Sequence, residues 1–118
     1  MKHKPKNMDT ITWEDFSKLE LRVGTILEAQ DFPEAIRPAY KLRIDFGDYG
    51  IKSSSAQITD LYNINELVGM QVIAVTNLSA KQIGPFISEC LVTGFYNSDN
   101  KVVLAVPEKD VDKGALLT

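Results

Sequence analysis

The chain has 118 residues, of which 44% are hydrophobic and 25% are charged, a length that gives one domain able to bury a core without staples. The formal net charge of −3 excludes a protein that grips nucleic acid through a broad basic stripe, because phosphate neutralisation needs clustered Lys and Arg. Residues 1–52 hold nine basic and nine acidic residues, whereas residues 53–100 hold one lysine and four acids. Any phosphate contact must therefore come from a local patch in the first half together with Lys81.

The sequence offers little for catalysis or membrane insertion. The basic first residues lead into no apolar segment, and no apolar stretch approaches the roughly 20 residues that a membrane span needs. The single cysteine, Cys90, cannot form an internal disulfide, and one histidine, His3, gives neither a metal cluster nor a catalytic triad. We therefore expect a cytoplasmic protein that is not an enzyme, holds no metal or cofactor and does not insert into a membrane.

The first elements in chain order are an arm, a helix and a strand. Residues 1–11 are polar and aperiodic, which predicts a flexible N-terminal arm before one domain over residues 12–118. Thr12 begins a short helix because its side chain can accept from the amide of Asp15. Alternation over residues 19–27 predicts a half-buried strand, with a bulge or bend at Gly24; Leu19, Leu21, Val23, Thr25 and Leu27 share one side of it.

The middle of the chain reads as two strands, a loop and a helix. Two prolines make residues 31–39 a loop, and the next strand turns Leu42, Ile44 and Phe46 inward and Lys41, Arg43 and Asp45 outward. A turn over 47–50 leads into a strand that opens at Ile51. Residues 60–68 favour a short helix closed by Gly69. Further strands are expected over 72–75, 90–96 and 102–106, with a turn over 97–100.

Short strands with one helix between the third and the fourth predict an all-β fold. The layout is that of a five-stranded Greek-key barrel of the oligonucleotide/oligosaccharide-binding (OB) type, with short N-terminal and mid-chain helices and extra C-terminal strands. Such a barrel leaves strand edges to cover. We expect the helix that carries Trp13 and Phe16, and the tail Ala115–Leu117, to cover them in a homodimer.

Two polar segments, residues 50–59 and 77–90, each carry a lysine beside an apolar run and read as two rims of one binding surface. Lysine, arginine, serine and asparagine side chains there can contact phosphate, ribose or base edges. The alternative to a binding surface is that the polar side chains only face solvent, on an ordinary strand and an ordinary turn. Arg22 could equally form a structural ion pair or contact a ligand. The predicted nucleic-acid-binding residues are Lys41, Arg43, Lys52, Ser54, Ser55, Asn77, Lys81 and Ser88.

Aromatic and proline side chains near the same rims suggest a second ligand. Exposed aromatic groups can hold an extended peptide, although burial of Phe86 against the barrel is an equal alternative. The predicted peptide-binding residues are Phe32, Pro38, Tyr40 and Phe86.

Five segments together resemble the tRNA-binding-domain family, which includes the C-terminal domain of many methionyl-tRNA synthetases. They are residues 16–26, 32–35, 38–42, 51–59 and 81–86. The resemblance implies a homodimeric OB-fold that binds folded tRNA by shape and a chaperone role in the export of precursor proteins. It departs at Ile36, where the family commonly has a basic residue. The implied partners are tRNA, unfolded or precursor polypeptides and a second copy of the chain.

Two alternatives stay open beside this interpretation. The chain could be a purely peptide-binding or precursor-binding chaperone with no physiological RNA ligand. A domain that a synthetase recruits in trans is less favoured, because no linker or fused catalytic segment is visible in the sequence.

Overall fold

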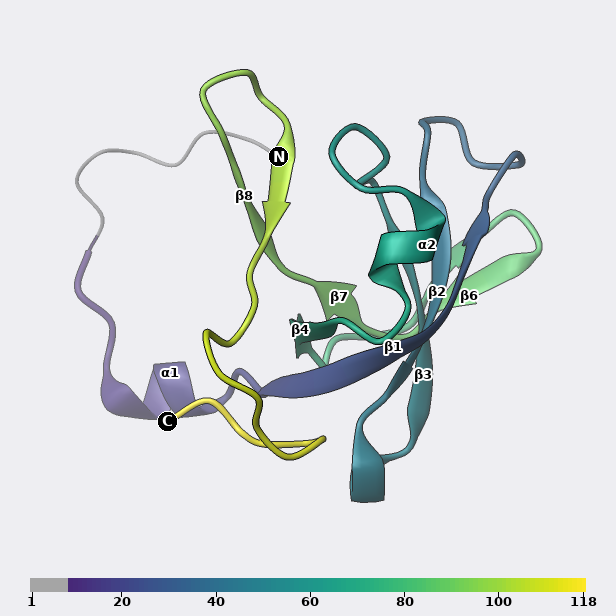
Figure 1. Cartoon of the computed structure of the whole chain (residues 1–118). Coiled ribbons are helices and arrows are strands. Elements are labelled where there is room, and N and C mark those ends of the chain that lie inside the picture. Colours follow the sequence, from purple (N-terminus) through teal and green to yellow (C-terminus); the bar gives the residue numbers. More distant parts are fainter. Residues whose placement is uncertain (1–8) are drawn as a thin grey trace.

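The computed structural model describes residues 9–118. A five-stranded antiparallel sheet has the strand order β3-β2-β1-β4-β7, and two small hairpins, β5–β6 and β8–β9, extend from it (Figure 1). In chain order the elements are α1 (Trp13–Ser17), β1 (Leu21–Asp31), β2 (Tyr40–Asp45), the 3-10 helix η1 (Gly47–Tyr49), β3 (Ile51–Ala56), α2 (Ile64–Leu67), β4 (Gln71–Val75), β5 (Lys81–Ile83), β6 (Phe86–Ser88), β7 (Leu91–Val92), β8 (Gly94–Tyr96) and β9 (Val102–Leu104).

The sheet curls until its two edges meet, which gives a nearly closed barrel. The edge of β3 is joined to the segment before β7 because the Glu89 N–H donates to the Ser53 carbonyl at 2.8 Å, and the Ser54 hydroxyl donates to the Cys90 carbonyl at 2.9 Å. With a helix between the third and fourth barrel strands, the predicted all-β Greek-key OB-type barrel is confirmed.

The core follows the alternation of β2 along the chain. Leu42, Ile44 and Phe46 are fully buried, as predicted, and Leu67 of α2 packs into the same cluster. The helix itself is shorter than predicted, and its N-cap is Asn63, whose side chain forms a reciprocal capping box with Glu66.

The alternation predicted for β1 holds at Val23, which is buried, but fails further along the strand. Ile26 is buried, whereas Leu27 is exposed, and the bulge lies between Ile26 and Glu28 rather than at Gly24. Gly24 instead faces the core, where an added Cβ would lie 2.5 Å from Ile44 Cγ2. Leu21 and Val23 line a pocket together with the C-terminal tail, whose backbone pairs with β1: the Val23 N–H donates to the Ala115 carbonyl at 3.0 Å.

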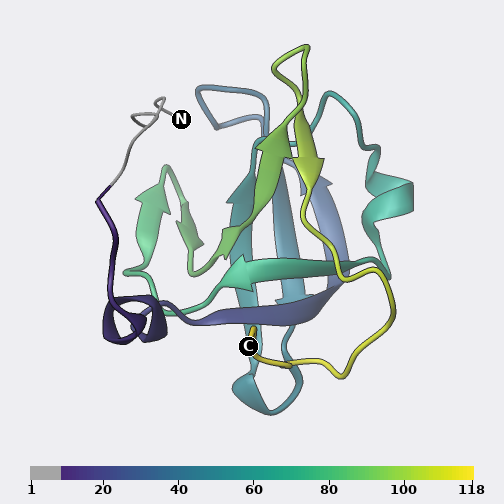
Figure 2. The ribbon, with the colours of Figure 1, turned by 90° about the vertical axis from the view of Figure 1, so that its left-hand side faces the viewer.

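In two segments the strands differ from those predicted from the sequence. No strand was predicted within residues 77–89, but they contain the β5–β6 hairpin, which turns at Gly84 with φ +56°. The strand predicted over 90–96 is broken at Thr93. The Thr93 N–H and hydroxyl both donate to the Ile73 carbonyl, at 3.0 and 2.7 Å, so β7 ends there and β8 leaves the barrel (Figure 2).

Arg22 fastens the C-terminal tail to the barrel. Its guanidinium donates to Glu20 Oε1 at 2.9 Å and to the Gly114 carbonyl at 2.7 Å, and it lies 3.5 Å from the centroid of the Tyr49 ring. The hydrogen bond from Arg22, followed by that from Thr76, holds the pKa of Glu20 below its ordinary value. The sequence left open whether Arg22 forms a structural ion pair or contacts a ligand, and these contacts are those of a structural residue.

Within residues 9–118, every helix is too short or too polar to cross a membrane. The same residues contain no group of three or more His, Cys, Asp or Glu side chains placed to hold a metal ion.

Candidate nucleic-acid interface

Six polar side chains from three neighbouring strands share one face on the outside of the barrel, which we call the outer face. Register pairs Lys41 with Gln30 and Ser55, and pairs Arg43 with Glu28 and Ser53. Because side chains alternate along a strand, these residues point away from the core that buries Leu42 and Ser54. The outer face is Glu28, Gln30, Lys41, Arg43, Ser53 and Ser55.

The cations of the outer face are available to a ligand. Arg43 lies 3.4 Å from Glu28 Oε1, and both side chains are 50% exposed. An exposed pair at this distance stabilises the fold little, so phosphate can displace it at low cost. Lys41 Nζ lies 5.6 Å from the centroid of the Phe32 ring, at the neighbouring end of the face.

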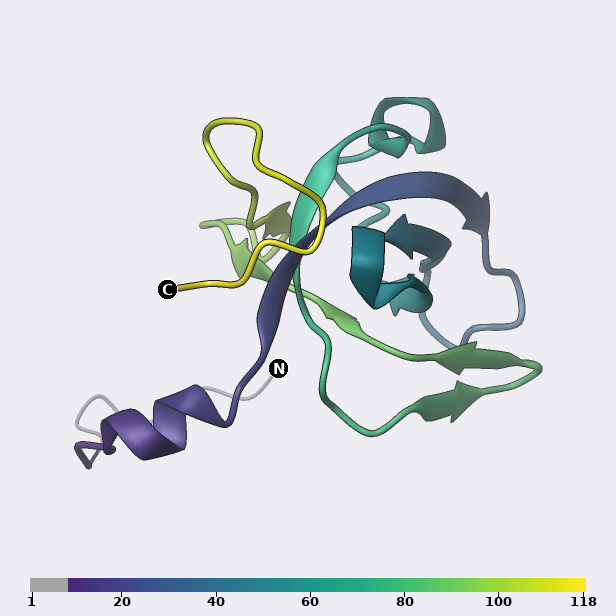
Figure 3. The ribbon, with the colours of Figure 1, turned by 90° about the horizontal axis from the view of Figure 1, so that it is seen from below.

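The β5–β6 hairpin stands beside the outer face and is attached to it at two points. Ser88 Oγ accepts a hydrogen bond from the Ser55 N–H at 3.1 Å. At the other point, the Phe86 ring packs edge-on against Phe32 with a centroid separation of 5.3 Å. Figures 1 and 3 both place the hairpin on the side of the molecule away from α1.

Two cavities flank this hairpin. The larger holds about 450 Å³ and is lined by the 34–39 loop, the end of β3 and the first strand of the hairpin, with Arg37, Ser55 and Lys81 among its lining residues. The smaller holds about 130 Å³ and lies on the outer face itself. Its lining residues are Glu28, Gln30, Lys41, Leu42, Arg43, Ser53 and Phe86.

The structure brings together half of the predicted nucleic-acid-binding set. Lys41, Arg43, Ser55 and Lys81 lie on the outer face or in the adjoining larger cavity. Ser88 lies beside them but already bonds to the backbone of Ser55.

The prediction for Ser54 was wrong, and Lys52 lies apart from the group. Ser54 is fully buried, because it alternates into the barrel and bonds to the Cys90 carbonyl. Lys52 pairs in register with buried Ile44, so it occupies the opposite face of β3 from Ser53 and Ser55. Its charge acts on Glu20, where it is a smaller influence on the carboxyl pKa than the hydrogen bond from Arg22.

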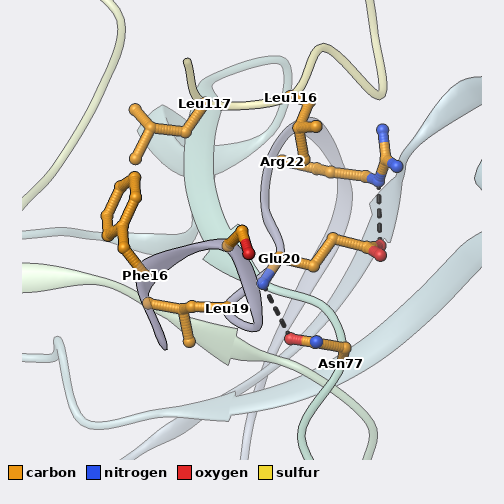
Figure 4. A pocket seen from close by; sticks show the side chains of 8 residues that line it. Phe16, Leu19, Glu20, Arg22, Asn77, Leu116 and Leu117 are labelled. Atoms are coloured by element: carbon orange, nitrogen blue, oxygen red, sulfur yellow. Dashed lines mark hydrogen bonds and ion pairs between the residues drawn. The ribbon is translucent and has the colours of Figure 1, made fainter. Parts of the chain in front are cut away.

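Asn77 binds the backbone of the segment that joins α1 to β1. Its amide donates to the Lys18 carbonyl at 2.6 Å, and its oxygen accepts from the Glu20 N–H at 2.9 Å (Figure 4). A pocket of about 260 Å³ lies there, lined in part by Phe16, Leu116 and Leu117. Asn77 is therefore separate from the outer face.

The predicted peptide-binding aromatics do not form an exposed set. Phe32 and Tyr40 are buried, so their prediction as surface contacts was wrong. The Tyr40 hydroxyl donates to the Tyr62 carbonyl at 2.8 Å, which satisfies its one polar group inside the fold. Pro38 is exposed and Phe86 is half-buried.

Sequence reasoning missed Glu28, Gln30, Ser53, Arg37 and Gln57. The alternation predicted for β1 already set Glu28 on the side opposite Leu27, so the period of this strand could have found Glu28 and Gln30, which pair with Arg43 and Lys41. Period-two alternation along β3 would have placed Ser53 with Ser55 and apart from Ser54. Burial raises the pKa of the Cys90 thiol to about 11.

A small, nearly closed barrel with polar side chains and adjoining cavities on its β1–β2–β3 face defines a protein of the OB class. The model of the putative tRNA binding domain matches residues 21–116, and the chain belongs to this family.

Two solved structures are similar over almost the whole chain. The chaperone CsaA from Bacillus anthracis has 43% sequence identity and a TM-score of 0.88, and the match covers 93% of this chain and 100% of that one. The CsaA chaperone protein from Picrophilus torridus has 50% identity and a TM-score of 0.86, covering 92% of this chain and 100% of that one. The resemblance read from the sequence is thereby confirmed.

Curated relatives match through one part of a longer protein. The methionine–tRNA ligase of Parabacteroides distasonis is 35% identical over 107 residues, which are 91% of this chain but 16% of the ligase. That of Thermococcus kodakarensis is 33% identical over 110 residues, covering 93% of this chain and 14% of the ligase.

Proposed function

We propose that this chain binds folded RNA of the tRNA class through the outer face and the larger cavity, and that it acts in the cytoplasm by binding rather than by catalysis. The observation that carries the proposal is the gathering of Lys41, Arg43, Lys81 and Arg37 around one side of the barrel. Membership of the putative tRNA binding domain family supports the same ligand.

Recognition by shape fits the charge of this face. Its cations are accompanied by Glu28 and Glu34, and the whole chain carries a net charge of −3. Only a few phosphates can be neutralised, so bulk electrostatic attraction is small. A folded RNA can still bind if its phosphates match the spacing of the cations.

A second copy of the chain is the proposed partner at the α1 end. None of the residues of α1 is buried, and the Trp13 side chain is 86% exposed. Phe16, Leu116 and Leu117 add apolar surface beside it, and Figure 2 shows α1 and the end of the chain on one face. A homodimer would cover this face and present two RNA-binding faces at a fixed spacing.

Sedimentation at micromolar concentration tests the dimer. The expected species is about twice the 13.2 kDa of one chain, and Trp13→Ala is expected to shift it toward the monomer because it removes the most exposed aromatic group of α1. Ile36→Ala is the matched control, since Ile36 is fully exposed in the 34–39 loop away from α1. A wild-type chain that sediments only as a monomer contradicts the dimer.

A chaperone role in the export of precursor proteins is the second part of the proposal. Both CsaA structures carry the description of chaperone. The larger cavity also suits a polypeptide, because Ala35, Ile36 and Ile83 line it beside polar groups. If this role is the only one, the chain is a peptide-binding chaperone without a physiological RNA ligand, and unfolded polypeptide rather than tRNA is its partner.

Mobility-shift titration with total tRNA at rising salt separates the two candidates. The proposal expects tRNA to bind more tightly than duplex DNA of the same length, with a modest salt slope because few phosphates are contacted. Equal binding of the duplex, or binding that appears only at very low salt, would contradict RNA recognition. Suppression of client aggregation by the same preparation would then favour the peptide-binding alternative.

A further inference from the structure

We infer that the smaller cavity on the outer face binds a single unpaired nucleobase, with a preference for guanine. The inference rests on the proposed function, since it takes RNA as the ligand. It adds a base-specific subsite to an interface that otherwise contacts phosphate and overall shape. The cavity is formed by Glu28, Gln30, Lys41, Leu42, Arg43, Ser53 and Phe86.

The size of the cavity suits the edge of one base. It is open to solvent and holds about 130 Å³, which is less than the volume of about 150 Å³ that accommodates benzene in a protein. A base can therefore insert its pairing edge while the rest of its ring system, its ribose and its phosphate stay outside. Lys41 also lines the cavity, and its charge can pair with that phosphate.

The cavity has an aromatic wall that is held in place. Phe86 lines it, and the Phe86 ring packs against Phe32, which is only 3% exposed. Two residues further along β6, the Ser88–Ser55 hydrogen bond fixes the strand to the barrel. Unpaired bases bind to proteins by contact with such aromatic groups, and a fixed ring loses little conformational freedom on binding.

The polar rim favours a base over an aromatic side chain of a peptide. A phenylalanine ring in the cavity would leave the Gln30 amide and the Ser53 hydroxyl without ligand partners, whereas a base edge can bond to both. The polar lining therefore disfavours an aromatic side chain of a peptide.

The pair of Glu28 and Arg43 selects among bases. It places an acceptor beside a donor, with 3.4 Å between Arg43 Nη1 and Glu28 Oε1. The pairing edge of guanine carries two adjacent donors, N1–H and the N2 amine, beside the acceptor O6. Glu28 can accept from the two donors while Arg43 donates to O6, which leaves Lys41 for the phosphate. Uracil and cytosine each offer one donor on that edge to a carboxylate, and adenine also offers one.

The test uses the trinucleotides UGU, UAU, UCU and UUU, with amide chemical shifts of Ser53 and Phe86 reporting on the site. Wild type is expected to bind UGU about tenfold more tightly than UUU, on the scale of one charged hydrogen bond. Glu28→Gln is expected to remove the preference for UGU. Phe86→Leu keeps apolar packing on Phe32 and is expected to weaken all four by about tenfold, whereas Phe95→Leu on β8 is the matched control and changes nothing.

Total tRNA is titrated in parallel, so that failure of the subsite and failure of the proposed function are distinct. Wild type that binds tRNA but treats all trinucleotides alike, with no effect of Phe86→Leu, overturns the base subsite and leaves the proposed function standing. Wild type that binds neither overturns both. A Gly-Phe-Gly peptide that shifts Ser53 and Phe86 at lower concentration than UGU also overturns the assignment to a base. Glu28→Gln lies on an exposed side chain and keeps the test valid if Phe86→Leu fails to fold.

Discussion

Replacement of Phe46 by alanine is expected to lower the free energy of unfolding by about 3–5 kcal/mol, the usual cost of removing a buried aromatic side chain. Phe46 is fully buried and directly follows β2, where its ring packs against the backbone of Gly24 in β1. The loss comes from the transfer of the ring and from the cavity left behind. Urea unfolding followed by circular dichroism measures it.

The close packing of β1 on β2 supplies the control for this prediction. A Cβ on Gly24 would lie 2.7 Å from Phe46 Cε1, so Gly24→Ala is expected to cost about 1–3 kcal/mol in the wild type. In the Phe46→Ala background the cost should be smaller, because the ring is gone and the new methyl group partly fills its space. Leu27→Ala, at the exposed bulge, should change stability by about 0.5 kcal/mol or less. Strictly additive effects of Gly24→Ala and Phe46→Ala would contradict the packing described here.

β2 could be predicted from the sequence, whereas β1 could not, and the difference is physical. β2 buries one face only, so the alternation of Leu42, Ile44 and Phe46 with charged residues identifies its inner side. β1 is covered on both sides at its start, by the barrel core at Gly24 and by the C-terminal tail at Leu21 and Val23. Alternation reports that a face is covered but not which layer covers it.

The candidate site could be located from the sequence but not assembled residue by residue. The charged outward positions of β2 follow directly from its period, and Lys41 and Arg43 lie where that period puts them. The prediction that Ser54 binds nucleic acid failed because a polar side chain was assumed to lie on the surface. Its buried hydroxyl is satisfied by a carbonyl 36 residues further along the chain, a contact that no local pattern announces.

The β5–β6 hairpin beside the site was likewise predictable in its local turn but not in its long-range contacts. Gly84 and Pro85 form a turn signal between two short segments of mixed polarity, so a hairpin could have been predicted there. Its attachment to the outer face could not. It depends on the contacts of Phe86 with Phe32 and of Ser88 with Ser55, which join residues 54 and 33 positions apart.

Loss of three cations around the outer face is expected to weaken tRNA binding by about tenfold to a hundredfold at moderate salt. The variant is Lys41→Ala/Arg43→Ala/Lys81→Ala. Each of these side chains reaches solvent from the outer face or from the larger cavity beside it, and each that contacts a phosphate contributes about one unit to the salt dependence. Fold stability should change little, because the one ion pair lost is exposed.

The slope of tRNA affinity against salt, measured for this variant and a matched one, tests most directly whether RNA binds to the outer face. The matched variant, Lys101→Ala/Lys109→Ala/Lys113→Ala, also removes three positive charges from exposed positions but leaves the outer face intact. The expected result is a slope lowered by two to three units, on the scale of about one unit per phosphate contact, in the first variant and an unchanged slope in the second. Equal losses in the two variants would mean that tRNA responds to net charge alone, and would contradict a binding surface on this side of the barrel.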